Sequence, residues 1–207
     1  MLFRDRDDAA RKLAEKLEQY CGQSPLVLAI PRGAVPMARI IADVLGGEMD
    51  VVLVRKIRAP GNPELAIGSV DETGWTYLAD YARHMADEAY IEAEKNNQLQ
   101  VMRVRRAQYT PVRLPHDPAG KVVIVVDDGL ATGATMIAAL HALRARNPKK
   151  LVCAVPVAPP DTLKKVESYA DETVCLYAPE FFHAVGQFYM DFQQVSDREV
   201  IELLKAG

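Results

Sequence analysis

The sequence lacks a long apolar segment. Hydrophobic residues make up 49% of its 207 residues, yet no uninterrupted run approaches the ~18 apolar residues that a membrane-spanning helix requires. The opening residues, MLFRDRDD, become charged almost at once, whereas a secretory signal does not. We therefore expect a cytoplasmic protein that has no membrane partner.

Cysteine is also scarce. The three cysteines, Cys21, Cys153 and Cys175, lie far apart and form no CxxC pair. An odd number of scattered cysteines argues against a disulfide framework. Reduced thiols in a cytoplasmic protein agree with this pattern.

An excess of basic charge is missing as well. The formal net charge is −3, so the chain as a whole should not attract nucleic acid. The length and the apolar content suit one globular domain that buries a sheet on both faces. We therefore predict a single domain over residues 1–207.

Short apolar runs alternate with amphipathic or polar segments along the chain. The runs predict buried strands at Leu26–Ile30, Asp50–Ile57, 121–128, 151–157 and 172–178. Helices are expected at 5–20, up to Leu45, and at 80–106, 134–146, 161–169 and 197–205, with a hairpin formed by 66–70 and 75–78 and a loop at 59–64. This alternation predicts an α/β fold with a mainly parallel sheet flanked by helices.

The most informative stretch is VVIVVDDGLATGAT, Val122–Thr135. An apolar strand ends in two acids, and a loop with two glycines and two threonines precedes a helix. At the carboxyl end of a strand, such glycines and a helix N-terminus favour a phosphate. The carboxylates suit neighbouring hydroxyls or Mg²⁺ instead. A phosphate beside a vicinal diol, as in ribose 5-phosphate, satisfies both halves of the motif.

Other phosphate-binding loops fit this stretch less well. A Walker A loop needs GK[ST], and no lysine stands in the loop. A dinucleotide fingerprint needs GxGxxG after the first strand, and that pattern is absent. The remaining alternative is an ordinary strand-to-helix turn that is capped by aspartate.

The stretch resembles the signature of the type I phosphoribosyltransferase family: four apolar residues, two acids and a loop that ends in TG-x-T, here VIVV-DD-GLA-TGAT. The resemblance extends over most of the chain in the order of its elements. It implies a Rossmann-like core that binds 5-phosphoribosyl-1-pyrophosphate (PRPP) with Mg²⁺. In it, Asp127 and Asp128 would hold the ribose hydroxyls, and also Mg²⁺ together with PRPP, while Ala131–Thr135 would wrap the 5-phosphate. The PRPP-binding set is then Asp127, Asp128, Gly129, Leu130, Ala131, Thr132, Gly133, Ala134 and Thr135.

By the same resemblance, the loop after the first strand would bind pyrophosphate through backbone amides. That loop is Pro31, Arg32, Gly33 and Ala34. The family often has a cis peptide beside the glycine, so we expect one at Arg32–Gly33. The alternative is a simple turn with a surface arginine.

Arg55 and Lys56, followed by Arg58, stand near the end of the second predicted strand. Cations at this place could offset the charge of a polyanion. The pair resembles the residues that reach PRPP in orotate phosphoribosyltransferases, which makes Arg55 and Lys56 candidate catalytic residues beside Asp127 and Asp128. The alternative is a pair of solvated strand-end charges. The next segment resembles the mobile catalytic flap of the family and comprises Ala59, Pro60, Gly61, Asn62, Pro63 and Glu64.

A variable hood caps the base pocket in this family. The core would span roughly 22–178, and the hood would combine residues 178–207 with the N-terminal helix. The tail region is aromatic, with Tyr177, Phe181, Phe182, His183, Phe188, Tyr189 and Phe192. Because aromatic faces stack on nucleobases, Tyr177, Phe181, Phe182 and His183 are candidate base-pocket residues. The alternative is a packed aromatic mini-core.

These observations favour an enzyme that transfers phosphoribosyl from PRPP to a nitrogenous base, with Mg²⁺ as cofactor, as a homodimer. Ala131 stands where hypoxanthine-guanine enzymes carry an aspartate, which disfavours those bases. Two alternatives remain open: a regulatory protein that senses PRPP or a nucleotide without catalysis, and a phosphatase or kinase of another α/β fold.

Overall fold

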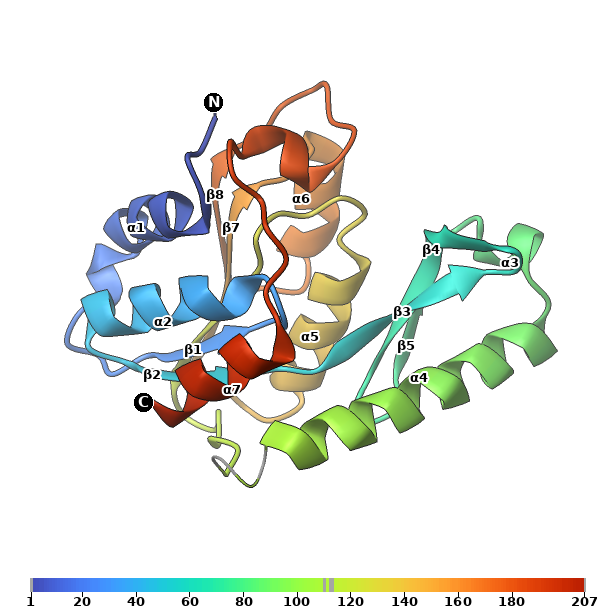
Figure 1. Ribbon diagram of the computed structural model, residues 1–207, viewed down its shortest axis with the longest axis horizontal. Coiled ribbons are helices and arrows are strands. Elements are labelled where there is room, and N and C mark those ends of the chain that lie inside the picture. Colours follow the sequence, from blue (N-terminus) through green and yellow to red (C-terminus); the bar gives the residue numbers. More distant parts are fainter. Residues whose placement is uncertain (1, 110, 112–113, 207) are drawn as a thin grey trace.

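A five-stranded parallel sheet forms the centre of the protein. The computed structural model describes residues 2–109, 111 and 114–206. The strands of the sheet lie in the order β2-β1-β6-β7-β8 (Figure 1). Their bounds are β1 Leu26–Ala29, β2 Glu48–Val51, β6 Val122–Val126, β7 Lys150–Val157 and β8 Glu172–Tyr177. The predicted α/β class with a parallel sheet is confirmed.

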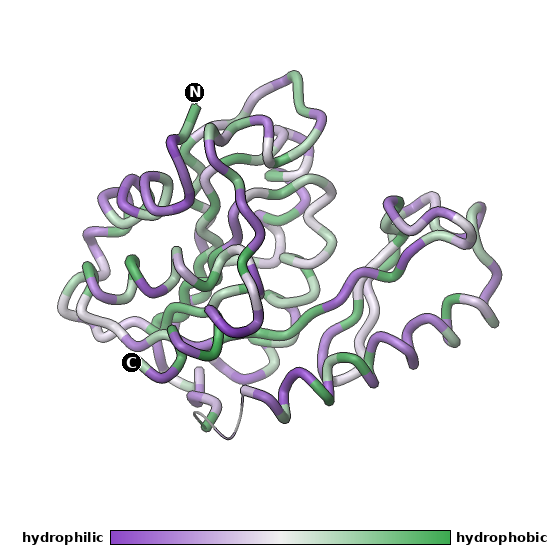
Figure 2. The backbone as a smooth tube through the Cα atoms, viewed as in Figure 1, coloured by the Kyte–Doolittle hydropathy of each residue, from purple (hydrophilic) through white to green (hydrophobic). Residues whose placement is uncertain are grey.

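Helices cover both faces of this sheet, because alternate strand residues point to opposite sides. In β6, Ile124 packs in one buried cluster, together with residues of α1 (Arg6–Lys16), α2 (Ala34–Leu45) and α7 (Asp197–Lys205). Its neighbour Val125 packs in a second cluster, with residues of α5 (Ala134–Arg144) and α6 (Pro160–Glu167). The apolar strands appear in green inside the layers of Figure 2.

The prediction of one strand over Asp50–Ile57 is wrong. The chain leaves the parallel sheet after β2 and continues as β3 (Val54–Ala59) in a separate antiparallel sheet, β3-β4-β5. β4 spans Asn62–Asp71 and β5 spans Thr76–Leu78. In β3 the cations are at least partly exposed while Val54, Ile57 and Ala59 are buried. A strand buried on both faces would have to desolvate those charges, so a half-exposed sheet suits the sequence better.

The prediction of a loop at Ala59–Glu64 is also wrong. β3 and β4 pair as far as Ala59 and Asn62, so only Pro60 and Gly61 form the turn of a β-hairpin. Pro-Gly marked the turn correctly, but the strands extend closer to it than the proline and glycine content indicated. The predicted hairpin that follows is present as β4 and β5.

The predicted long polar helix is present as a short α3 (Ala82–Met85) followed by α4 (Glu88–Tyr109). Together with the antiparallel sheet it forms a lobe that projects from the main body (Figure 1). The lobe is tied to the core at Ser69 of β4, whose buried hydroxyl donates to the Ala134 carbonyl at 2.6 Å. Because Ala134 begins α5, this hydrogen bond holds the lobe against the start of that helix.

Residues 3 and 4, near the start of the sequence, pair with residues 188–191, which precede α7. The Phe3 N–H donates to the Phe188 carbonyl, and the Met190 N–H donates to the Phe3 carbonyl, each at 2.8 Å. The rings of Phe3 and Tyr189 pack with centroids 5.5 Å apart. From here on, the word hood means residues 2–6 and 184–196 only, a narrower set than the predicted hood of residues 178–207 with the N-terminal helix. Two 3₁₀ turns, Glu18–Tyr20 and Val185–Phe188, complete the regular structure of the described chain.

Throughout the portion of the chain that the structure describes, none of the helices is both long enough and apolar enough to cross a membrane.

Candidate ligand-binding site

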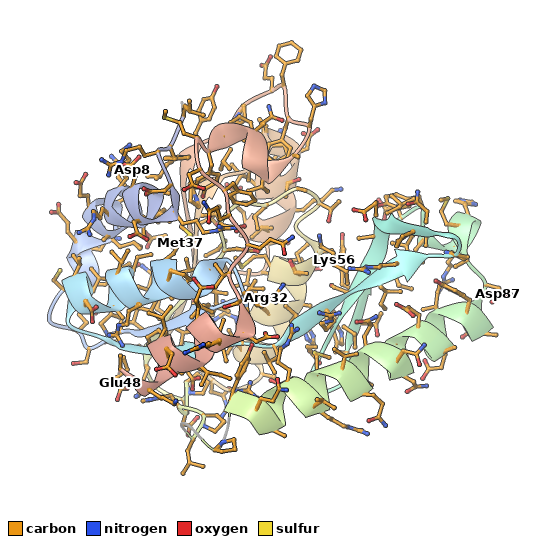
Figure 3. All side chains as sticks on the ribbon, viewed as in Figure 1. Asp8, Arg32, Met37, Glu48, Lys56 and Asp87 are labelled. Carbon is orange, nitrogen blue, oxygen red and sulfur yellow. The ribbon has the colours of Figure 1, made fainter. Side chains whose placement is uncertain are left out.

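A cavity of about 480 Å³ opens at the carboxyl ends of β1 and β6. One wall comes from the loops after these strands, one from β3, and one from the hood. Figure 3 shows Arg32 beside the C-terminal tail and Lys56 on β3. The lining residues are Arg6, Ile30, Pro31, Arg32, Gly33, Val54, Arg55, Lys56, Arg58, Asp127, Asp128, Gly129, Leu130, Ala131, Thr132, Gly133, Thr135, Val185, Phe192, Gln194 and Val195.

Two adjacent carboxylates, Asp127 and Asp128, lie at the base of the cavity. Burial and the neighbouring Asp128 charge raise the pKa of Asp127 well above its usual range. Burial also raises the pKa of Asp128, while the Arg6 guanidinium acts in the opposite direction. The native state therefore bears a cost for keeping this pair ionised.

Each of the two carboxylates has one oxygen engaged by the protein. Asp127 Oδ1 accepts the Asp128 N–H at 2.9 Å, and Asp128 Oδ2 accepts Arg6 Nε at 2.9 Å. Among residues 2–109, 111 and 114–206, no other residue donates to the second oxygen of either carboxylate. One oxygen of each carboxylate is thus available to accept a hydrogen bond, and a vicinal diol has two hydroxyls to donate.

The glycine-threonine loop joins β6 to α5. Gly133 has φ +78°, a left-handed conformation that glycine adopts without strain, and a Cβ there would come 2.9 Å from Thr162 Cγ2. Thr132 and Thr135 line the cavity at the start of α5, where backbone N–H groups favour an anion. Leu130 lines the cavity too, but its N–H is bonded to the Val157 carbonyl at 2.9 Å. Of the predicted PRPP-binding set, only Ala134 is outside the lining.

The loop after β1 brings Pro31, Arg32 and Gly33 to the cavity, while Ala34 is buried as the first residue of α2. The cis peptide bond is Pro31–Arg32, so the expectation of one at Arg32–Gly33 is wrong by one residue. Gly33 already has helical torsions, with φ −58° and ψ −33°, at the start of α2. The cis peptide bond therefore lies on the N-terminal side of Arg32, and the bond between Arg32 and Gly33 is trans.

Gly33 is required for a close approach rather than for its torsions. A Cβ at Gly33 would lie 2.3 Å from Asp128 Oδ2 and 3.0 Å from Arg6 Nη2. A side chain at this position would collide with the ion pair. The loop after β1 and the acids after β6 therefore pack directly against each other.

Cations line the wall opposite the acids. Arg32, Arg55, Lys56 and Arg58 all reach the cavity. Burial lowers the pKa of Arg55, and the nearby charges of Arg105, Arg58 and Arg32 lower it further. Arg55 Nε donates to Gln98 Oε1 of α4 at 2.8 Å, which fixes its orientation. Mutual repulsion of these cations would be relieved by a polyanionic ligand.

The structure does not bring the predicted flap residues Ala59–Glu64 to the cavity. They form the tip of the β3–β4 hairpin, at the end of the same strand that supplies Arg55 and Lys56.

The predicted aromatic residues do not line the cavity either. Tyr177 and Phe182 pack against Phe188, at centroid distances of 5.9 Å and 5.3 Å, which is the mini-core alternative. Phe181 is 85% exposed, and His183 is exposed as well. Other hood residues face the cavity instead, namely Val185, Phe192, Gln194 and Val195. Sequence composition identified the aromatic tail but not which of its side chains turn inward.

Arg6 is a charged site residue that the sequence did not reveal. It stands at the start of an amphipathic helix, where an arginine is usually solvated, and 122 positions separate it from Asp128. No local pattern connects two residues this far apart.

A metal site made only of protein side chains is not found in the described part of the chain, which holds no cluster of three or more His, Cys, Asp or Glu residues suited to a metal ion.

Comparisons with known proteins agree on one family. The family model described as "Phosphoribosyl transferase domain" matches residues 5–193. The chain is 42% identical over 206 residues to a Mycobacterium tuberculosis protein named "Putative phosphoribosyl transferase". That match covers 98% of this chain and 46% of the relative, so the chain spans about half the length of that protein.

Solved structures share the fold of this chain. The crystal structure of TT1426 from Thermus thermophilus is 46% identical, with a TM-score of 0.83 over 100% of this chain and 99% of that one. A purine phosphoribosyltransferase from Pyrococcus horikoshii is 16% identical, with a TM-score of 0.50 over 92% of both chains. The second likeness concerns the fold alone.

We predict that Asp127→Asn stabilises the folded protein. The pKa of Asp127 is raised in the native state, so ionisation at neutral pH costs stability that the neutral amide does not. Tm should rise by about 2–4 °C for each ~1 kcal/mol of relieved cost. The gain should shrink as the pH falls, because wild-type Asp127 then takes up a proton.

Thermal unfolding from pH 5 to pH 8 would measure this effect, with the exposed Asp191→Asn as the matched control. An unchanged or lower Tm of Asp127→Asn at neutral pH would contradict the prediction.

Proposed function

Since this chain belongs to the phosphoribosyl transferase domain family, we propose that it transfers the 5-phosphoribosyl group of PRPP to a nitrogenous base and releases pyrophosphate. The observation that carries this proposal is the pairing of two open carboxylate oxygens with a glycine-threonine loop in one cavity. A sugar phosphate offers two hydroxyls and a phosphate at matching positions, whereas a plain phosphomonoester does not use the acids.

The sugar phosphate would occupy the end of the cavity below β6. Asp127 and Asp128 would accept hydrogen bonds from the 2′- and 3′-hydroxyls, and Ala131–Thr135 would enclose the 5-phosphate. These contacts orient C1 of the ribose, since they fix the far side of the ring. In this proposal the acids take no proton from the reacting atoms.

The pyrophosphate would lie against the cationic wall. As the nitrogen of the base forms its bond to C1, the bond from C1 to the pyrophosphate oxygen breaks and its electron pair leaves with the pyrophosphate. Arg55 and Lys56, which line the cavity, would stabilise that developing negative charge, and the loop of Arg32 and Gly33 would offer backbone N–H groups. The half-buried position of Arg55 strengthens such an interaction.

Mg²⁺ fits this site only as a partner of the ligand. Two carboxylate oxygens do not fill the six positions of its octahedral shell, and the described residues offer no third acidic or histidine ligand in a cluster. Oxygens of PRPP would supply further ligands, and the ion would neutralise charge on the departing pyrophosphate.

The base would enter between the sugar and the hood, where Val185 and Phe192 provide apolar surface. The proposal includes neither hypoxanthine nor guanine, because Ala131 replaces the aspartate of enzymes for those bases. The family resemblance also carries the proposal of a homodimer. Val101 and Val104 on α4 are 39% and 61% exposed, and they offer apolar surface for it.

The direct test incubates the protein with PRPP, Mg²⁺ and a panel of pyrimidines, purines and related bases, and measures pyrophosphate release. We expect release with one class of base only. Tight PRPP binding with no release for any base would favour the PRPP-sensing alternative. Hydrolysis of phosphomonoesters without PRPP affinity would contradict both.

We predict that Asp127→Asn combined with Asp128→Asn weakens PRPP binding at least ~10-fold, because two charge-assisted hydrogen bonds become neutral ones. Pyrophosphate alone should bind these variants about as well as the wild type, since it does not use the acids. Isothermal titration calorimetry would measure both ligands. Unchanged PRPP affinity would show that the sugar lies elsewhere.

We further predict that Arg55→Ala combined with Lys56→Ala lowers kcat by about 10²–10³-fold, a loss typical of removing charge stabilisation from a transition state. Thr76→Ala, on β5 of the same antiparallel sheet and outside the cavity lining, serves as the control. A drop in PRPP affinity with kcat unchanged would assign the two cations to binding rather than to catalysis.

A further inference from the structure

Arg6 is held by the hood on one side and by the acidic pair on the other. Its Nε and Nη2 both lie 2.9 Å from Asp128 Oδ2. Its Nη1 donates to the Gln193 carbonyl at 2.5 Å, and its guanidinium lies 4.0 Å above the Phe192 ring. The side chain is only 13% exposed. A flexible arginine with this many contacts is fixed in one orientation.

The backbone around Arg6 is fixed as well. Asp5 caps α1 by accepting the Asp8 N–H at 2.8 Å, and Arg4 accepts the Asp191 N–H at 2.9 Å. The guanidinium is therefore not carried by a frayed terminus. It projects from an anchored helix start directly into the cavity wall.

The hood grips Asp128 at two points. Arg6 contacts the carboxylate, and the Tyr189 hydroxyl donates to the Asp128 carbonyl at 2.6 Å. Tyr189 itself packs on Phe3. The orientation of the Asp128 carboxylate thus depends on both segments of the hood, through Arg6 and Tyr189.

The contacts of Arg6 are selective for one oxygen. Its Nε and Nη2 both contact Oδ2, which lies 2.3 Å from where a Cβ of Gly33 would stand. Oδ1 has no donor from another residue within the described portions of the chain. An arginine that gripped both oxygens would compete with a ligand, whereas this geometry secures one oxygen and leaves the other open.

We propose that Arg6 is a positioning residue for sugar recognition: by holding Asp128 Oδ2 it directs Oδ1 to a hydroxyl of the ribose. This inference rests on the proposed function, because it requires a sugar at the acidic pair. If it is correct, Arg6 strengthens the binding of a sugar phosphate that carries the hydroxyl in question and does not affect the binding of one that lacks it.

The dependence on a hydroxyl separates this role from two others. If Arg6 contacted the anionic groups of the ligand directly, its removal would weaken all sugar phosphates equally. If Arg6 only stabilised the hood, its removal would lower Tm without changing the preference among sugars. A cycle that removes the Arg6 side chain and the ligand hydroxyl, separately and together, measures the coupling energy between them, as a double-mutant cycle does for two residues.

The experiment measures the Kd of ribose 5-phosphate, 2-deoxyribose 5-phosphate, 3-deoxyribose 5-phosphate and pyrophosphate by calorimetry, for the wild type, Arg6→Ala and Arg6→Lys. We expect Arg6→Ala to bind ribose 5-phosphate roughly 5–30-fold more weakly, as for the loss of one well-oriented hydrogen bond to a charged group. For one of the two deoxy sugars the variant and the wild type should agree within about twofold. Pyrophosphate affinity should also be unchanged within about twofold.

Lys12→Ala is the matched control. Lys12 is another cation of α1, paired with Asp8 at 2.8 Å and outside the cavity lining. Its removal changes the charge of the same helix by the same amount, and we expect no change in any sugar affinity. Arg6→Lys keeps the charge and should restore part of the preference for ribose 5-phosphate. It also serves as the test variant if Arg6→Ala does not fold.

Two results would overturn the inference while leaving the proposed function intact. One is an equal loss of affinity for all three sugars in Arg6→Ala, and the other is no loss for any of them, in both cases with the wild type binding ribose 5-phosphate. If the wild type itself binds none of the sugar phosphates and no PRPP, the proposed function fails, and the inference fails with it.

Discussion

The burial of two neighbouring negative charges is the constraint around which the site is built. Asp127 and Asp128 follow directly on β6, the middle strand of the parallel sheet, where burial disfavours an ionised carboxyl. The protein offsets this cost with a backbone N–H, the Arg6 guanidinium and the more distant charge of Lys56. Unlike replacement by apolar residues, this arrangement keeps two oxygens free for a ligand.

Several other features follow from that constraint. Position 33 has no room for a side chain, because the carboxylate and its arginine fill the space. The hood must lie close enough to Asp128 for Arg6 to contact its carboxylate and for Tyr189 to donate to its carbonyl. The wall formed by β3 carries cations rather than apolar residues, which is possible because that strand belongs to a half-exposed sheet. The resulting field runs from positive to negative across the cavity and would orient a polyanionic sugar in one direction.

Much of the fold was predictable because it is encoded locally. The apolar runs of β1, β6, β7 and β8 each stand between turn signals, and the motif from Val122 to Thr135 carries both its strand and its phosphate loop in fourteen consecutive letters. The break between β2 and β3 was missed because Asp50–Ile57 reads as one apolar run. What divides it is the need to leave Arg55 and Lys56 accessible, which is a tertiary requirement rather than a local one.

Some of the site residues were also predictable from the sequence, and others were not. Loops that follow strands fall at the carboxyl edge of the sheet by topology, so Pro31–Gly33 and Asp127–Thr132 could be placed from sequence. No comparable rule predicts whether a side chain of the hood points into the cavity or into solvent. Phe192 turns toward Arg6 while Phe181 turns to solvent, although both belong to the same aromatic tail. The pairing of Arg6 with Asp128 joins residues 122 positions apart, and periodicity carries no information about it.

The pairing of residues 3 and 4 with residues 188–191 also bears on how the molecule is made. Arg6 and its acceptor at Gln193 are 187 positions apart, so Arg6 leaves the ribosome long before its acceptor does. Until the tail emerges, Phe3 has no Tyr189 to cover it and remains an exposed aromatic ring on a growing polypeptide. The parallel sheet and its acids can assemble earlier from residues 26–177. Completion of the binding site therefore waits until residues 188–193 have been synthesised, and a nascent chain truncated before residue 188 would hold the acids without the contacts that anchor residues 3–6.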